Sequence, residues 1–303
     1  MPTVPAGWRE LEVRAPAAEE ERVVAALDLA GSRGSWTPAA GVVRGYFDAD
    51  EAAPDVAFRR AWAALAGDPD RFDLRLVDVP PTDWTAPYRA AARPVAATAR
   101  LWVAPPDAAA PEEGWPADAV VVRIQPGAGF GTGGHATTRA LLAWLDSEPG
   151  ADTVLDVGTG SGVLAIAAAL LGTRHAVGLD PDLDALANAA ENRRSNRVEN
   201  RVALVAGTVD ALRGDARFDR VLANLDAATL DRLLPDLASA CAQGGRVGVA
   251  GLLAAERDAC LDRARAAGLV LLDERTEPDP ALGDAWWSGW LAPVAVTPSA
   301  TSR

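Results

Sequence analysis

The chain of 303 residues is long enough for two domains, and its 49% hydrophobic content is typical of ordinary globular packing. Its formal net charge of −13, without a long basic run, argues against indiscriminate nucleic-acid binding and suits a cationic partner. No apolar stretch approaches the roughly 20 residues of a membrane span, and no secretory signal is evident, so a cytoplasmic location is expected. The two cysteines and two histidines offer no zinc-ligand spacing, so no metal site is predicted.

The first eighty residues alternate between strand-like and helix-like patterns. The predicted elements are a strand over 8–14, a helix over 17–30, extended stretches over 35–36 and 42–47, a helix over 55–66 and a strand over 72–79. The order β-α-β-β-α-β commonly folds as a ferredoxin-like two-layer sandwich. We therefore predict a ferredoxin-like α+β domain over residues 1–80, a frequent docking platform whose fold alone says nothing about chemistry.

Residues 81–118 are predicted to connect this domain to a second one. Trp84–Ala97 has the pattern of a helix, and a strand over 100–103 follows it. The stretch Ala104–Asp118 is rich in proline, alanine and acids, which favours a flexible surface linker. We therefore place the second domain at 119–295.

Strands alternate with helices throughout this second domain. The predicted strands cover 120–124, 153–157, 175–179, 201–205, 220–225 and 246–251, with 269–276 and 286–294 as a closing pair. This pattern predicts an α/β fold, a doubly wound, Rossmann-like sheet with one antiparallel edge strand. Residues 296–303 lack periodicity and are predicted to form a disordered tail.

The segment 154–162, V-L-D-V-G-T-G-S-G, predicts a buried strand that opens into a glycine-rich turn before an apolar helix. Glycines such as Gly158 and Gly160 allow backbone N–H groups and the helix N-terminus to approach a ligand closely. A dinucleotide fingerprint would need a further glycine at Val163, so the nicotinamide interpretation fails. The remaining D-x-G-x-G-x-G from Asp156 resembles the first motif of class I S-adenosylmethionine-dependent methyltransferases. A corner that needs glycine only for steric reasons is the alternative.

A second acidic residue, Asp180, ends the next predicted strand, 24 residues after Asp156 (180 − 156). In βαβ units an acid at this place accepts hydrogen bonds from ribose hydroxyls, and we assign Asp180 to that role. Asp182 and Asp184 follow closely, and we expect them to cap the next helix.

The stretch Gln125–Arg139, Q-P-G-A-G-F-G-T-G-G-H-A-T-T-R, predicts a glycine-rich loop. Its functional interpretation is a loop that crosses the carboxyl edge of the sheet and closes over the cofactor. Phe130 would then pack against the ligand, and Thr137 and Thr138 would bind its polar end. An ordinary surface turn before a helix is the alternative. His135 is expected to hold the loop in shape rather than to exchange protons.

These motifs resemble one family, the bacterial methyltransferases that trimethylate amino groups of large-subunit ribosomal protein eleven. The family's loop D-P-G-x-x-F-G-T-G-x-H-x-T-T matches Pro126–Thr138, and its N-[IL]-x-A motif matches Asn224–Ala227. Later G-G and S-G-I-L elements look like 244–245 and 251–253. Three positions depart from the family pattern: Gln125 replaces an acid, Gln243 stands where a proline often occurs, and Asp226 adds a charge.

The resemblance implies S-adenosylmethionine as the cofactor and a ribosomal protein as the substrate, recognised by the N-terminal domain. The cofactor contacts that it implies from the loop are Phe130, Gly131, Thr137 and Thr138. The cofactor site that it implies on the sheet contains Asp156, Gly158, Gly160 and Asp180. It further implies that Asn224 holds both the methionine end of the cofactor and the incoming amine. The expected acceptors are lysine amino groups, with the N-terminal amine as a further candidate.

Amine methylation needs a neutral nitrogen, whereas a free lysine amine has a pKa near 10.4 and is mostly protonated at neutral pH. Desolvation and the positive sulfonium disfavour the ammonium form, and the Asn224 side-chain oxygen can orient the lone pair without forming an ion pair. A dedicated general base is then unnecessary. The alternative is that Asn224 only ends a strand in a turn.

Three functional hypotheses remain open at this point. The first is methylation of the ribosomal protein, the second is methylation of lysines in another protein, and the third is a cofactor-binding protein without catalysis. The acidic net charge fits a basic protein client and opposes direct RNA modification. An aromatic cluster of Trp286, Trp287 and Trp290 is predicted to pack in the core, with an interface role as the alternative.

Overall fold

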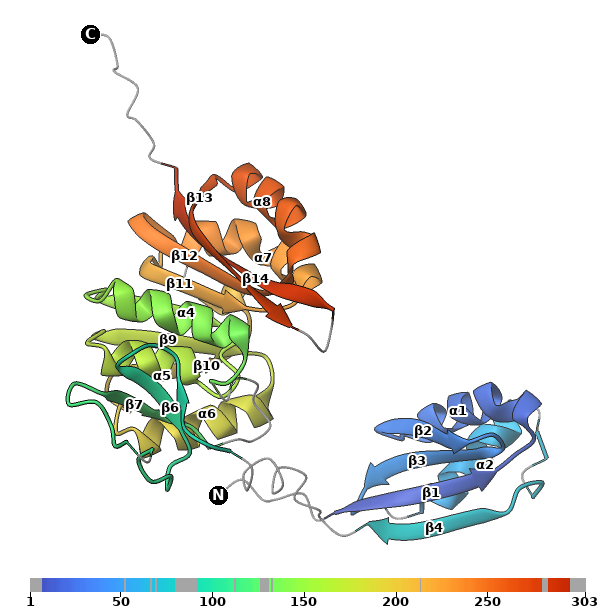
Figure 1. Cartoon of the computed structure of the whole chain (residues 1–303). Helices are drawn as coiled ribbons and strands as arrows, with labels where there is room; N and C mark the ends of the chain where they lie inside the picture. The colour runs from blue at the N-terminus through green and yellow to red at the C-terminus, as the bar shows by residue number, and fades with distance from the viewer. Residues whose placement is uncertain are drawn as a thin grey trace. The chain divides into compact units, whose positions relative to one another are not determined.

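The computed structural model divides into two compact units, Met1–Trp84 and Thr85–Arg303, which are described separately (Figure 1). The structure describes residues 7–51, 53–65, 67–68, 70–79, 92–111, 113–125, 131, 133–212, 214–279 and 283–294. In this described part of the chain, no helix is long and apolar enough to cross a membrane.

The first unit is a four-stranded antiparallel sheet with two helices, and it has the ferredoxin-like fold. Its elements are β1 (Trp8–Arg14), a 3-10 turn (Ala17–Glu19), α1 (Glu20–Leu29), β2 (Gly34–Ala39), β3 (Val42–Asp48), α2 (Pro54–Ala64) and β4 (Leu74–Val79), with the sheet order β2-β3-β1-β4. Leu11, Val13 and Phe47 lie on one face of the sheet and pack against Phe58 and Trp62 of α2. This alternation of buried and open positions explains the strand pattern of the sequence.

The second unit largely alternates strands and helices from β7 onward, as the sequence predicts. Its strands are β5 (Val95–Ala96), β6 (Leu101–Ala104), β7 (Val120–Arg123), β8 (Thr153–Val157), β9 (His175–Asp180), β10 (Val202–Ala206), β11 (Phe218–Asn224), β12 (Cys241–Leu253), β13 (Leu269–Asp279) and β14 (Asp284–Pro293). Its helices are α4 (Ala136–Ser147), α5 (Val163–Leu170), α6 (Leu183–Ser195), α7 (Ala227–Ala240) and α8 (Arg257–Ala266), with 3-10 turns at Val209–Ala211 and Ala254–Glu256.

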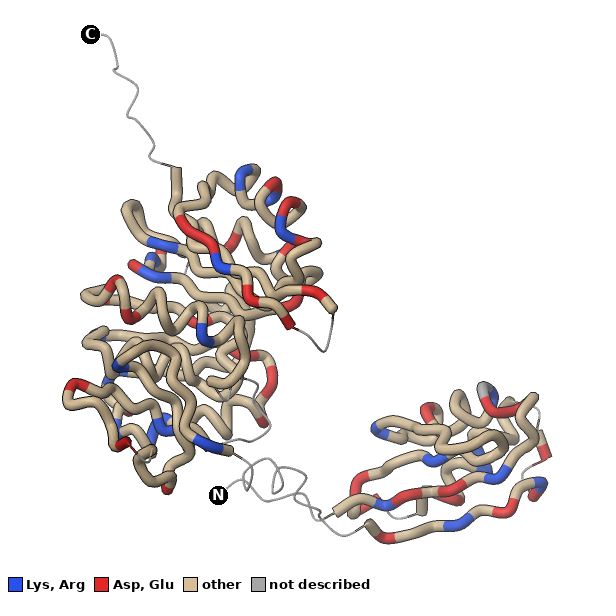
Figure 2. Tube along the Cα trace, in the orientation of Figure 1, with Lys and Arg blue, Asp and Glu red and all other residues tan. Residues whose placement is uncertain are grey.

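Seven strands form the main sheet in the order β10-β9-β8-β11-β12-β14-β13, and β14 alone runs antiparallel to the other six. The prediction of an antiparallel edge strand is therefore wrong, because β14 lies between β12 and β13. Burial explains the order: β13 carries exposed Glu274, Arg275 and Glu277, whose charges suit an edge (Figure 2). In contrast, β14 carries buried Trp287 and Trp290, which suit an interior strand.

Two further predictions at the start of this unit need correction. Residues 120–124 were expected in the main sheet, but β7 pairs with β6 in a separate three-stranded sheet, β5-β6-β7. A helix was expected over 84–97, yet 92–94 are irregular and Val95–Ala96 forms β5. Pro94 accounts for this, since proline disfavours helical backbone at and before its own position. The remainder of that expected helix lies outside the described residues.

The predicted linker 104–118 does not join the two units. Its residues run from β6 to β7 inside the second unit. Arg123 donates hydrogen bonds to the carbonyl oxygens of Pro105 and Ala108, and Trp115 packs edge-on against Trp102. This segment, rich in proline, alanine and acids, is therefore a loop of the second unit that hydrogen bonds to its backbone and an aromatic contact hold in place. The predicted tail 296–303 lies outside the described residues.

Two apolar clusters cover the two faces of the main sheet. Helices α4 and α5 pack on one face, where Trp144 stacks on Trp290 with 5.3 Å between ring centroids. Helices α7 and α8 pack on the other face, where Trp287 is fully buried. The prediction of core packing is thus confirmed for Trp287 and Trp290, whereas Trp286 lies at a cavity.

Candidate functional site

The site lies where the order of the parallel strands reverses. From β8 the chain proceeds to β9 and β10 on one side of the sheet, and then crosses to β11 on the other side. The connections that follow the paired strands β8 and β11 lead to helices on opposite faces of the sheet, and open α/β sheets bind ligands at such a point. A cavity of about 620 Å³ lies there, within the range of small-molecule sites of roughly 300–1,000 Å³.

The glycine-rich turn after β8 forms one wall of this cavity. Gly158, Gly160 and Gly162 have φ angles of +69°, +53° and +82°, in the left-handed region that favours glycine. A Cβ atom on Gly158 would lie 2.4 Å from a methyl carbon of Leu225, which lines the same cavity. The backbone conformation thus favours glycine at 158, and any larger residue there would also displace the end of the Leu225 side chain.

Asp180, the last residue of β9, lies at the cavity and braces this turn. One carboxylate oxygen accepts a hydrogen bond from the Gly160 N–H at 2.9 Å, and the other accepts one from the Asp182 N–H at 3.0 Å. Asp182 caps α6 through the Asp184 N–H, which confirms the expected capping role of Asp182.

Asp156 does not line the cavity, contrary to the prediction that it belongs to the cofactor contacts. It is 1% exposed, and one carboxylate oxygen accepts hydrogen bonds from the Thr159 hydroxyl at 2.6 Å and the Ala165 N–H at 3.2 Å. Its other oxygen finds no hydrogen-bond partner among the described residues. Asp156 therefore supports the turn and the first turn of α5 from behind.

The opposite wall joins the start of α4 to the end of β11. Thr137 and Thr138 lie in the first turn of α4, and Asn224 is the last residue of β11. The Asn224 side-chain amide donates a hydrogen bond to the Thr138 hydroxyl at 3.2 Å, although the two residues are 86 positions apart. All three residues line the cavity, so the structure brings together the predicted loop and sheet residues.

The glycine-rich loop is described at its two ends. Gly131 lines the cavity, and its carbonyl oxygen accepts a hydrogen bond from the Ser161 hydroxyl at 2.7 Å. Residues 126–130, including the predicted contact Phe130, lie outside the described residues.

His135 stands between the loop and α4. Its Nδ1 lies 2.7 Å from the Thr137 hydroxyl oxygen, and its ring meets Trp286 edge-on at 4.7 Å between centroids. Burial lowers the pKa of His135, which favours the neutral ring. These contacts support the predicted shape-holding role.

The structure adds residues to the cavity that sequence reasoning did not select. They include Gly207 and Thr208 after β10, Leu225 and Asp226 after Asn224, Leu233, Gly251, and Trp286. Gly207 and Thr208 follow a predicted parallel strand, so the rule that ligands bind at carboxyl ends could have identified them. Gly251 has φ +97°, and a Cβ there would lie 2.3 Å from the Leu225 carbonyl oxygen.

Asp226, a departure from the family pattern, caps α7. Its carboxylate accepts hydrogen bonds from the Thr229 N–H at 3.0 Å and from the Thr229 hydroxyl at 2.8 Å. These bonds lower the pKa of Asp226 and hold its charge at the positive end of the helix dipole.

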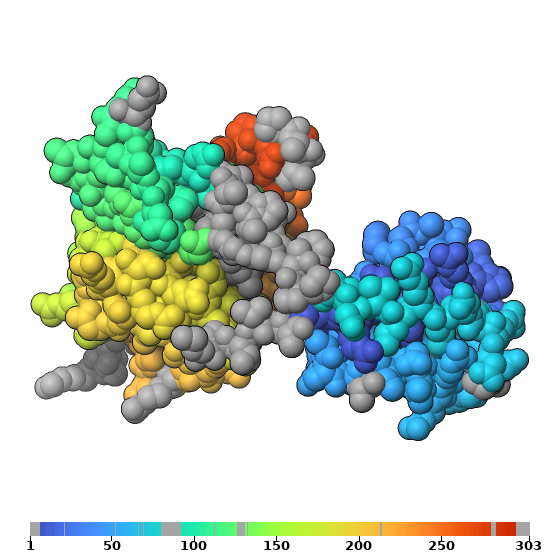
Figure 3. All heavy atoms as spheres, turned by 90° about the horizontal axis from the view of Figure 1, so that it is seen from below, coloured from blue at the N-terminus to red at the C-terminus, as the bar shows by residue number. Residues whose placement is uncertain are grey.

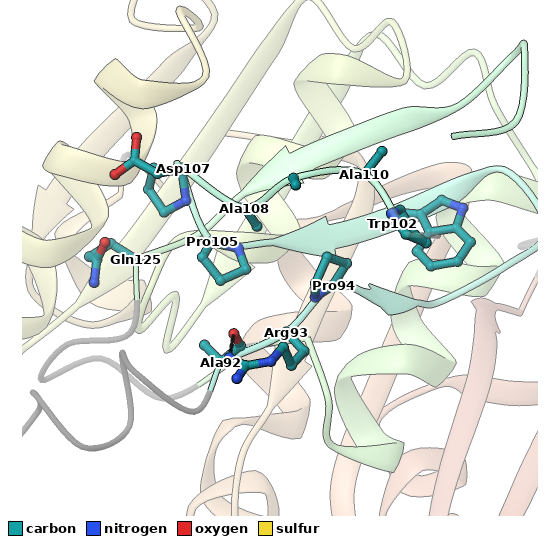
Figure 4. Close-up of a pocket in the computed structure, with 12 residues that line it drawn as sticks. Ala92, Arg93, Pro94, Trp102, Pro105, Asp107, Ala108, Ala110 and Gln125 are labelled. Atoms are coloured by element: carbon teal, nitrogen blue, oxygen red, sulfur yellow. Dashed lines mark hydrogen bonds between the residues drawn. The ribbon is translucent and has the colours of Figure 1, made fainter. Parts of the chain in front are cut away.

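A larger hollow of about 800 Å³ lies along β6 and the 105–111 loop, with Trp102 near one end and Gln125 near the other (Figure 4). Its wall is mostly proline and alanine, with Arg93 and Asp107 as its charged residues. None of the predicted site residues lines it. Because the smaller cavity gathers the convergent polar groups, we assign the functional site to that cavity.

The environment of Asp156 predicts a pH dependence of stability. Burial raises the pKa of this carboxyl from 3.8 to about 6. The folded chain then holds the proton more tightly than the unfolded chain, so this stabilisation is fully present below about pH 4 and is lost as the pH rises through about 6. The pKa difference between the folded and the unfolded chain corresponds to roughly 3 kcal/mol in the free energy of unfolding.

We therefore expect the unfolding free energy of the parent, minus that of Asp156→Asn, to increase by up to about 3 kcal/mol between pH 7.5 and pH 4. Urea unfolding of both proteins at a series of pH values measures this difference, in which other titrating groups cancel. A difference that does not change with pH would contradict the assignment of a raised pKa to Asp156.

Comparison with known proteins agrees with this geometry. The family model described as "Ribosomal protein L11 methyltransferase (PrmA)" matches residues 37–279. The ribosomal protein L11 methyltransferase of Sorangium cellulosum is 39% identical over 247 residues, covering 77% of this chain and 76% of its own, and that of Chromohalobacter salexigens is 38% identical over 70% of each chain. The crystal structure of a ribosomal protein L11 methylase from Lactobacillus delbrueckii subsp. bulgaricus superposes with a TM-score of 0.57 at 26% identity, over 67% of this chain and 100% of its own. The chain therefore belongs to the ribosomal protein L11 methyltransferase family.

Proposed function

We propose that this chain transfers methyl groups from S-adenosylmethionine to amino groups of ribosomal protein L11, chiefly lysine side chains. The observation that carries the proposal is the meeting of Asn224 and Thr138 with the glycine-rich turn in one cavity at the reversal of strand order. Family membership supports the client, since the relatives are named for it. The cytoplasmic location and the basic character of the substrate protein are predictions from the sequence.

The residues present fit S-adenosylmethionine. Gly158 and Gly160 line the cavity without side chains, and Asp180 lies at the cavity wall. Each Asp180 oxygen already accepts one backbone N–H, and a carboxylate offers about four acceptor sites, so capacity remains for two ribose hydroxyls. When bound, the cofactor supplies an electrophilic methyl group on a sulfonium.

Asn224 is suited to receive the amine. Its amide nitrogen is engaged with Thr138, which fixes the orientation of the side chain. The described residues supply no hydrogen-bond partner to its carbonyl oxygen, so that oxygen is available to accept an N–H from the substrate amine. A neutral acceptor orients the nitrogen lone pair without the ion-pair energy that would stabilise ammonium.

The position of the cofactor can be tested at Gly160. We expect Gly160→Arg to weaken S-adenosylmethionine binding by at least about a hundredfold, or roughly 3 kcal/mol, because the side chain would occupy the cavity. Calorimetry measures this affinity. Gly172→Arg is the matched control, because Gly172 also has a positive φ, +112°, but open space surrounds its Cβ position. Equal affinities of the two variants would contradict the proposed position.

The role of Asn224 predicts a separation of binding from turnover. Asn224→Ala should bind S-adenosylmethionine within about threefold of the parent but lose about 10²–10³ in kcat, the range seen when one positioned polar group is removed. Asn224→Asp should shift the activity profile to higher pH, because a carboxylate favours the ammonium form of the substrate. An unchanged kcat in Asn224→Ala would exclude this role.

We also propose that the first unit recognises the client. Both of its helices pack on one face of the sheet, and Trp36 of β2 is 57% exposed. Adjacent strands carry Glu10, Glu12 and Arg44, which form an ion-pair cluster. A face with aromatic and ionic groups suits the binding of another protein.

This division of labour predicts that a protein lacking residues 1–84 keeps its affinity for S-adenosylmethionine within about threefold and loses at least about 90% of its methylation rate on ribosomal protein L11. Tritiated cofactor and purified ribosomal proteins provide the assay. One labelled band from the parent supports the proposed client, and labelling of a different protein would indicate another lysine substrate. Cofactor binding without any labelling would indicate loss of catalysis.

A further inference from the structure

Two asparagines of α6 and the asparagine that caps its C-terminus bind the backbone beside β7. Asn188, Asn192 and Asn196 are four residues apart and therefore share one face of the helix. In Figure 3 this helix (yellow) lies beside the chain segment that contains β7 (green). Asn196 bonds the Arg123 N–H at 2.8 Å and the Arg123 carbonyl at 2.6 Å, Asn192 accepts from the Gln125 N–H at 2.8 Å, and Asn188 donates to the Gln125 carbonyl at 3.2 Å.

The side-chain amides of these asparagines form the hydrogen bonds that a neighbouring strand would otherwise form with the outer edge of β7. β7 is the last strand of its sheet, so its outer N–H and C=O groups lack a strand partner. A side-chain amide carries the same donor and acceptor as a peptide group. Four residues of a helix span about 6 Å along its axis, and two residues of a strand span about 6.6 Å. The spacing between Asn192 and Asn196 therefore matches the spacing between Gln125 and Arg123.

Asn192 differs from the other two because it also reaches the cofactor turn. Its amide nitrogen donates to the Ser161 carbonyl at 2.9 Å, while its oxygen accepts from Gln125, and its side chain is fully buried. Ser161 in turn donates from its hydroxyl to the Gly131 carbonyl at 2.7 Å. Asn192 and Ser161 thus connect the turn to Gln125 and to Gly131, the described residues on either side of 126–130.

We infer that Asn192 is a positioning residue for the methyltransfer reaction, setting the distance between the glycine-rich turn and the residues that begin and end the loop. It lines no part of the cavity, so it acts through Ser161, Gln125 and Gly131. The inference rests on cofactor binding at the turn, as the proposed function does. It also explains why glutamine is acceptable at 125: the bonds to α6 use only the backbone of that residue.

A purely structural role for the asparagines makes a different prediction. Asn196 forms three side-chain hydrogen bonds, two to Arg123 and one to the Asn192 carbonyl, whereas Asn192 forms two. If the asparagines only fastened β7 to α6, loss of Asn196 would harm the protein at least as much as loss of Asn192. Among the described residues, Asn196 forms no hydrogen bond with the turn, so Asn196→Ala is the matched control.

The experiment compares the full-length variants Asn192→Ala and Asn196→Ala by calorimetry with S-adenosylmethionine and by thermal unfolding. We expect Asn192→Ala to weaken cofactor binding about tenfold, and Asn196→Ala to change it by less than about twofold at a similar or greater loss of stability. Equal effects of the two variants on affinity would overturn the inference.

Two further variants keep the test decisive if Asn192→Ala folds poorly. Ser161→Ala removes only the hydroxyl bond to Gly131 and should weaken cofactor binding about threefold. Asn192→Asp keeps the acceptor for Gln125 and regains a donor toward Ser161 only when its carboxyl is protonated. Its affinity relative to the parent should therefore recover as the pH falls from 8 to 5.5, and parental affinity of both variants at pH 8 would refute the role of Asn192.

The outcomes also separate this inference from the proposed client. Affinity for S-adenosylmethionine is measured without any acceptor protein. A parent that methylates no ribosomal protein, with the expected loss of affinity in Asn192→Ala, would exclude the proposed client and support the positioning role. A parent that methylates ribosomal protein L11, with parental affinity in Asn192→Ala and Ser161→Ala, would support the client and exclude the positioning role.

Discussion

The site depends on a backbone turn that is held between two carboxylates. Gly158, Gly160 and Gly162 adopt left-handed conformations, and a turn of this kind needs partners for its buried N–H groups to remain in one shape. Asp180 accepts the Gly160 N–H from the cavity side, and Asp156 accepts the Ala165 N–H from behind. The positions of the sheet edge, the start of α5 and the loop end at Gly131 are all fixed relative to this turn.

Topology then gathers distant parts of the sequence around the turn. The crossing from β10 to β11 places Asn224 opposite Gly158, and the start of α4 brings Thr138 against Asn224. The insertion of β14 beside β12 adds Trp286 at the cavity, where it meets His135. Each contributing segment is short, and its place depends on pairing between strands rather than on its own sequence.

The sequence therefore predicts local backbone features well, but it does not predict which of two similar residues faces the cavity. Glycine spacing and the Asp182 cap follow from local backbone chemistry, and both agree with the structure. Asp156 and Asp180 look equivalent in the sequence, yet only Asp180 faces the cavity, because Asp156 precedes the turn by two residues and packs against the start of α5. Trp286 pairs with Leu253 beyond a register shift between β12 and β14, and no local pattern encodes such a pairing.

The placement of charge around Asn224 bears on how a neutral amine is selected. A carboxylate beside the reacting nitrogen would stabilise ammonium and so oppose methyl transfer. Asp226 is only two residues away, but its charge is held by the Thr229 N–H and hydroxyl at the start of α7. Asp156 is buried behind the turn and does not line the cavity. The group at the end of β11 is a neutral amide, oriented by Thr138, and an amide of this kind can accept an amine by hydrogen bonding rather than by ion pairing, as the proposed function requires.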